Sequence, residues 1–232
     1  MEQMLNFAQG PLFRLAFAVL VVGLLRRAIL MAWPAYVAWR RARDQSIRWS
    51  NYFKDLESWL FPLTHAMTSR LVFTAVSYFF HVGLILVPIF LADHVSLWTV
   101  SISLTLPALP KSVADILTIL TMAGVTFLLV SRFVHPMMRK LSKWEDYTVL
   151  ILILFAFISG YVAGRSWNPI SYNAMLLLHV VSAEILMMAV PFTKLSHCIL
   201  FPFARLCSEI GSKLASDINY TYVSPITRGK RP

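Results

Sequence analysis

The stretch LLLHVVSAEILMMAVPFTKLSHCIL, residues 176–200, decides the fold. It lies mostly within a long apolar run, residues 174–192. A helix that rises ~1.5 Å per residue needs about 20 such residues to cross a hydrocarbon core of ~30 Å. Four more runs of this kind are present, at residues 11–37, 70–92, 113–130 and 147–164. They are continuously apolar, whereas the strands of a β-barrel alternate in polarity. The sequence therefore predicts an all-α membrane protein with a bundle of five transmembrane helices.

Composition agrees with this interpretation. Of 232 residues, 58% are hydrophobic and only 14% are charged, which lies outside the range of ordinary soluble domains. The N-terminal sequence MEQMLNFAQG lacks a basic start and a cleavage site, so we expect the first run to be retained as a helix. No long linker, repeat or low-complexity tract interrupts the chain, and a single domain over residues 1–232 is predicted.

The basic residues predict the orientation of the helices. Most of the net charge of +10 lies between the first and second runs, between the third and fourth, and after the fifth. The positive-inside rule then places the N-terminus outside and the C-terminus in the cytoplasm, with the protein in the cytoplasmic (inner) membrane. These charges also suit contact with lipid head groups. Because they follow the loops and accompany no recognition motif, nucleic-acid binding is not expected.

Four histidines lie within or beside the apolar runs, where an imidazole is costly and usually functional. His179 and His197 are eighteen residues apart, which on one continuous helix is five whole turns and roughly 27 Å. They would therefore project from the same side at opposite membrane surfaces. His81 and His94, in YFFHVGLILVPIFLADH, are thirteen residues and roughly 20 Å apart. By contrast, His65 and His135 fall in cytoplasmic loops and are expected to be solvated.

The second and fifth helices can thus supply one histidine each at two levels. Two stacked haems with two axial imidazoles each require this arrangement. On a regular helix His81 and His94 would point about 140° apart, so we expect Pro88 to kink the helix and re-aim one of them. Taken singly, each histidine is also explained by a structural hydrogen bond.

HVVSAEILMMAVPFTKLSHCILFPFARL, residues 179–206, resembles the last membrane helix of the gamma-type cytochrome b subunits. This family includes the membrane subunit of respiratory nitrate reductase and its relatives in sulfur-metabolising complexes. The resemblance extends through FFHVGLILVPIFLADHVSLW and WEDYTVLILIL, and covers roughly residues 70–206. In the nitrate reductase branch, the second histidine of the second helix falls where this chain has Leu91. The position of His94 looks more like the subunits of transmembrane c-type cytochrome complexes and of Dsr-type or heterodisulfide-reductase-type complexes.

The resemblance implies two haem b groups. His81 and His197 would hold one on the cytoplasmic side, and His94 and His179 would hold the other on the outer side. It also implies electron transfer between membrane quinone, with menaquinone expected, and a cytoplasmic iron–sulfur subunit or a multihaem cytochrome c.

Other polar groups in the apolar runs are candidates for the same chemistry. Arg26 and Arg27 interrupt the first run and would either pair with haem propionates or snorkel to the interface. Glu184 lies five residues beyond His179 and would either pass protons to a quinone or make a structural hydrogen bond. Lys111 would either hydrogen-bond a quinone carbonyl or anchor its helix at the membrane interface.

Two cysteines complete the set of reactive residues. Cys198 and Cys207 are expected on the cytoplasmic side as free thiols. Because the chain has no cysteine cluster for an iron–sulfur centre and no soluble catalytic domain, it is predicted to be one electron-transfer subunit of an oxidoreductase complex. The alternative is a haem-free membrane anchor or assembly subunit with structural histidines.

Overall fold

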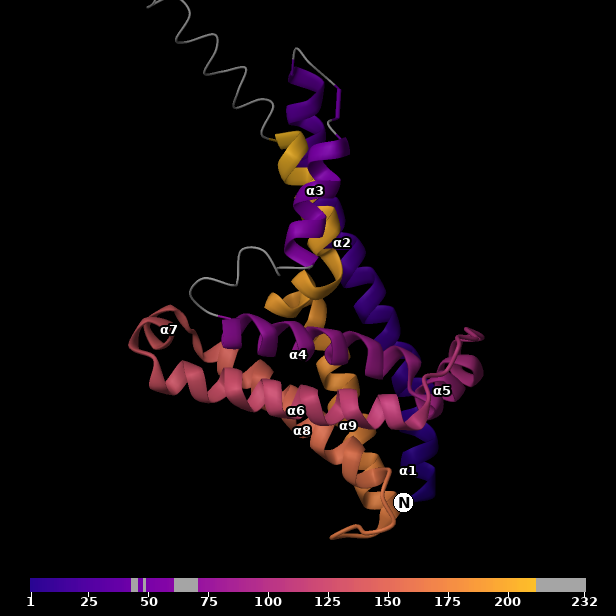
Figure 1. Ribbon diagram of the computed structural model, residues 1–232. Helices are drawn as coiled ribbons and strands as arrows, with labels where there is room; N and C mark the ends of the chain where they lie inside the picture. The colour runs from indigo at the N-terminus through magenta and orange to yellow at the C-terminus, as the bar shows by residue number, and fades with distance from the viewer. Residues whose placement is uncertain (43–45, 48, 61–70, 212–232) are drawn as a thin grey trace, which may run out of the picture. The chain divides into compact units, whose positions relative to one another are not determined.

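The first helix is longer than the sequence predicts. The computed structural model describes residues 1–42, 46–47, 49–60 and 71–211 (Figure 1). Three segments follow one another without interruption: α1 (Glu2–Phe7), the π-helical turn η1 (Ala8–Leu12) and α2 (Phe13–Arg41). Pro11 lies inside η1, where the wider turn accommodates a residue that has no backbone N–H.

The remaining described elements are also helical. They are α3 (Trp49–Leu60), α4 (Leu71–Phe90), α5 (Ala92–Ile102), α6 (Lys111–Val134), α7 (Pro136–Leu141), α8 (Trp144–Ala163) and α9 (Tyr172–Ala189). Two 3₁₀ turns follow α9, η3 (Val190–Phe192) and η4 (Lys194–Ser196), and residues 197–211 are helical again.

Five of the described helical stretches are long and apolar enough to span a membrane. They are Glu2–Arg41, Leu71–Phe90, Lys111–Val134, Trp144–Ala163 and Tyr172–Phe192. For the described residues, the predicted all-helical fold with five helices able to span a membrane is therefore confirmed. The orientation of the termini and the choice of the inner membrane stay predictions.

The chain divides into two compact units. Among the described residues, the first unit holds 1–22 and 71–198, and the second holds 23–42, 46–47, 49–60 and 199–211. The predicted single domain stays a prediction. His65 lies outside the described residues.

Within the first unit, helices pack in the series α4, α6, α8 and α9, and α4 has little backbone contact with α9. The core of this series includes Phe80, Val125 and Ile153. Gly83 lets α4 approach α6 closely, since a Cβ at this position would lie 2.8 Å from the carbonyl oxygen of Leu117. Small residues at such crossings are typical of membrane bundles. α4 and α9 are thus the two ends of the series.

The N-terminal segment packs on α5 in the same unit. The Ser101 hydroxyl donates to the carbonyl oxygen of Gln9 at 3.0 Å, and Arg14 Nε donates to the carbonyl oxygen of Ser101 at 3.0 Å. The Trp98 ring lies edge-on to the rings of Phe13 and Phe17, at centroid distances of 5.0 and 5.7 Å. These contacts fix the orientation of α5.

In the second unit, α3 packs on the helix of residues 199–211. Arg205 forms an ion pair with Asp55 at 3.1 Å, and the Tyr52 hydroxyl donates to the carbonyl oxygen of Pro202 at 3.2 Å.

Candidate functional site

His94 owes its position to a break in the second predicted helix. The sequence predicts one helix over residues 70–92 with a kink at Pro88, whereas the structure breaks the helix at Leu91. α4 continues through Pro88 and ends at Phe90, while Leu91 is extended with ψ 135°. The free carbonyl groups at the end of α4 find other donors: Phe90 accepts from the Leu109 amide at 2.8 Å, and Pro88 accepts from the Trp98 indole at 3.2 Å. Since these donors replace helical ones, the break at Leu91 is tolerated and turns His94 in a new direction.

His197 also lies beyond a break. The five-turn argument for His179 and His197 assumed a continuous helix, but α9 ends at Ala189. Pro191 lacks the N–H that would continue the helical ladder, and Thr193 is extended. The two 3₁₀ turns η3 and η4 carry the chain from α9 to His197. Its position therefore depends on these turns and not on helical phase.

An ion pair holds the second of these turns in place. Lys194 Nζ lies 2.7 Å from a carboxylate oxygen of Asp146, at the start of α8. The same carboxylate accepts a hydrogen bond from the backbone N–H of Lys143 at 2.9 Å, which caps α8. The carbonyl oxygen of Lys194 accepts from Nδ1 of His197. Lys194 thus links the start of α8 to the imidazole.

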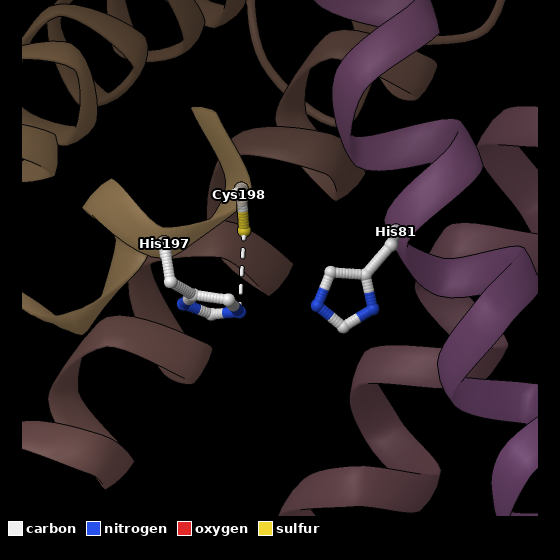
Figure 2. Close-up of side chains that lie close together, drawn as sticks. All are labelled: His81, His197 and Cys198. Carbon is white, nitrogen blue, oxygen red and sulfur yellow. Dashed lines mark hydrogen bonds between the residues drawn. The ribbon is translucent and has the colours of Figure 1, made fainter. Parts of the chain in front are cut away.

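The structure places His81 next to His197. Their ring centroids are 5.7 Å apart and their planes are inclined by 69°. Nδ1 of His81 lies 2.6 Å from the carbonyl oxygen of Ser77, one turn earlier on α4. Figure 2 shows the two rings pointing toward each other, one from α4 and one from the start of the helix that follows η4.

The structure also places His94 next to His179. Their ring centroids are 5.8 Å apart and the planes are nearly parallel, at 14°. Nδ1 of His179 lies 3.0 Å from the carbonyl oxygen of Ala156 on α8, and Nδ1 of His94 lies 3.3 Å from that of Val87 on α4. Gly160 makes room for the His179 ring, because a Cβ there would lie 2.6 Å from its Cε1.

All four histidines share one hydrogen-bond pattern. A carbonyl oxygen can only accept, so each Nδ1 carries the proton and each Nε2 keeps a lone pair. Histidines that bind metals almost always show this pattern, with the other ring nitrogen donating to a carbonyl or carboxylate. An iron between two imidazoles, with metal–nitrogen bonds of about 2.0 Å, separates the ring centroids by about 6 Å. The donor set and spacing of both pairs thus fit axial ligation of haem.

Among the described residues, Cys198 adds a third potential ligand to one pair only. Its Sγ lies 3.7 Å from Nε2 of His197 (Figure 2). Ligand atoms of His81, His197 and Cys198 all lie within 4.8 Å of one another. Both Cys198 and Cys207 are free thiols, as predicted. Burial raises the pKa of Cys198 to about 11, so without a cation the thiol is neutral.

Glu184 is a buried acid without a partner among the described residues. It lies on α9 with 2% of its surface exposed, and neither carboxyl oxygen has a hydrogen-bond partner in the described parts of the chain. A carboxyl group in such surroundings is expected to be a neutral acid.

One curated relative matches almost the whole chain. A protein of Nitratidesulfovibrio vulgaris (strain Hildenborough) is 32% identical over 208 residues, which cover 87% of this chain and 90% of the relative. The two chains belong to one family. The description of that member states no activity. Neither a model of a protein family nor a solved structure matches the chain.

Three further residues are predicted from the sequence to take part, namely Lys111, Arg26 and Arg27. Lys111 is exposed as the first residue of α6, and its role with a quinone stays a prediction. Arg26 and Arg27 belong to the second unit, and their pairing with propionates also stays a prediction.

Several contributing residues are missed by reasoning from the sequence. Arg14, Asp146, Gly160 and Lys194 act through partners far away in the chain, so no local pattern indicates them.

Proposed function

We propose that the protein is a dihaem cytochrome b membrane subunit that transfers electrons between membrane quinone and a redox partner. The proposal is supported above all by the two histidine pairs. In each pair, both Nδ1 atoms donate to backbone carbonyl groups, and the ring centroids are separated by nearly the distance expected for two imidazoles that bind one iron. The resemblance to the gamma-type subunits supports the same assignment.

The residues would divide the work as follows. His81 and His197 hold one haem, and His94 and His179 hold the other. Bound haem supplies one-electron chemistry, while the protein sets ligation, burial and distance. The hydrogen bond at each Nδ1 would fix the tautomer and orientation of the imidazole and leave Nε2 available to a bound haem.

Quinone chemistry also needs a proton path. Glu184 is a buried acid five residues from His179 on α9, and an orphaned carboxyl group there can exchange a proton with a quinone. Lys111 would bind a quinone carbonyl from the start of α6. Because the chain offers no cluster of cysteines, the electrons enter or leave through a separate iron–sulfur subunit or a multihaem cytochrome c, and the basic loops would dock the cytoplasmic partner.

The purified protein tests the proposal directly. We expect a b-type reduced-minus-oxidised difference spectrum that corresponds to two haems per chain. His135→Ala is the matched control, since His135 is exposed at the end of α6, and it should retain both haems. A purified, helical protein without a b-type spectrum would defeat the proposal and favour the alternative, a haem-free membrane anchor or assembly subunit.

A further inference from the structure

Among the described residues, the His81–His197 pair has a cysteine thiol beside its ligand atoms, and the other pair does not. His81 lies on α4, while His197 and Cys198 are consecutive residues after η4 (Figure 2). The three side chains come from two segments that are more than 100 residues apart in the chain, yet their ligand atoms lie within 4.8 Å of one another.

One distance between these atoms is close to that of a tetrahedral metal site, and the others lie within 4.8 Å. With a zinc–sulfur bond of about 2.3 Å and a zinc–nitrogen bond of about 2.0 Å, the sulfur and nitrogen ligands of tetrahedral zinc lie about 3.5 Å apart. Cys198 Sγ and His197 Nε2 are 3.7 Å apart. The Nδ1 protons of both histidines are donated to the carbonyl groups of Ser77 and Lys194, so each Nε2 has a lone pair for a metal. The lone pair of His197 accepts from the Cys198 thiol, whose proton leaves when a metal binds.

The thiol constrains haem binding at this pair. Cys198 Sγ lies 3.7 Å from Nε2 of His197 and within 4.8 Å of a ligand atom of His81, which is space that a flat porphyrin between the imidazoles needs, so haem binding requires Cys198 to turn away. A single cation would use the thiol where it is.

We propose that His81, His197 and Cys198 bind one zinc-class divalent cation when haem is absent from this pair. Three protein ligands leave the fourth tetrahedral position to water. Binding forms a metal–sulfur bond, breaks the S–H bond and releases its proton to water. Haem and the cation need the same imidazoles and therefore exclude each other. The inference stands on these three side chains and does not depend on the proposed haem function.

Cobalt titration of the full-length chain tests the site. The chain is prepared in detergent from cells that cannot make haem, its helicity is checked by circular dichroism, and Co²⁺ is added. We expect one equivalent to bind with a thiolate-to-cobalt charge-transfer absorption. Cys198→Ser should abolish this absorption and weaken Co²⁺ binding more than about tenfold. A tenfold loss of affinity is the smallest that is typical when a residue that only hydrogen-bonds to a metal ligand is changed. Cys207→Ser and His135→Ala are the controls, and both should bind Co²⁺ as the unaltered chain does.

Three outcomes would overturn the inference: a helical chain that binds no Co²⁺, a Cys198→Ser variant that keeps the charge-transfer absorption, or a Cys207→Ser variant that loses it. Thiol labelling in native membranes covers the case in which the haem-free chain loses its helices in detergent. Zn²⁺ should protect Cys198 from a maleimide and leave Cys207 reactive, and equal labelling of both cysteines would count against the site.

The two proposals fail separately. A chain that binds Co²⁺ but never shows a b-type spectrum retains the cation site and loses the cytochrome function. A chain with two haems should bind no Co²⁺ at this pair, and the haem-free form of the same chain should bind it. Co²⁺ binding with the thiolate absorption in the fully haem-loaded chain would show that the two ligands do not share the imidazoles, and would overturn the inference.

Discussion

The two histidine pairs have almost the same ring spacing but are held in different ways. The imidazoles of His94 and His179 are nearly parallel and donate to carbonyl groups of other helices. Those of His81 and His197 are steeply inclined and donate to carbonyl groups three or four residues earlier in their own segments. One pair is therefore positioned by helix packing and the other by local backbone. Changes in helix packing should affect the first pair, and changes in the turns after α9 should affect the second.

Removing one imidazole from each pair gives the largest expected effect. His179→Ala and His197→Ala should each lose one of two haems, because an axial ligand is removed. The b-type absorbance should fall by half in both variants, and the remaining haem should have a different midpoint potential in each. A redox titration of the purified proteins measures this. Retention of both haems in either variant would refute the assignment of that pair.

A methyl group at Gly160 should disturb only the packed pair. The new Cβ would lie 2.6 Å from Cε1 of His179, so the ring must move. We expect a loss of about 1–3 kcal/mol in stability and a weakened or altered haem at His94 and His179. Haem content and the spectrum of the oxidised protein report the change. Gly164→Ala is the matched control, because its Cβ would have no neighbour closer than 3.6 Å. The same loss in both variants would contradict the steric explanation.

Lys194→Ala should act on the other pair, and more weakly. Its ion pair with Asp146 is largely exposed on the lysine side, so at most about 1 kcal/mol of stability should be lost. The potential of the haem at His81 and His197 should shift, while that of the second haem should not. Asp115→Asn breaks the separate ion pair with Arg165 and is the control. A shift of both potentials in Lys194→Ala would mean that the pairs are not positioned independently.

Glu184→Gln should have the smallest effect on stability. A neutral acid and an amide have similar shapes, and neither gains a charged partner, so the melting temperature should change little. Quinol oxidation should nevertheless slow and lose part of its pH dependence. Unchanged oxidation kinetics across the pH range would leave Glu184 with a structural role only.

The number of membrane helices and the partners of the histidines could be predicted from the sequence, because apolar length and residue spacing are local properties. The pairing came out as expected although both helices that carry it are broken. Pro191 signals one break in the sequence. The other, at Leu91, has no glycine or proline at the site, since it depends on the Trp98 indole and the Leu109 amide as substitute donors. Gly160 carries no signal either, because its meaning depends on a ring from another helix.

Lys194 contacts Asp146 through its side chain and His197 through its backbone carbonyl group. Its side chain is tied to the carboxylate that caps α8, and its carbonyl oxygen receives the Nδ1 proton of His197. The strength of that hydrogen bond sets how much electron density the imidazole offers to a metal. A displacement at the beginning of α8 would therefore change the hydrogen bond to His197 through Lys194, and with it the donor strength of the imidazole. Lys194 thus couples a surface ion pair to the electronic character of His197.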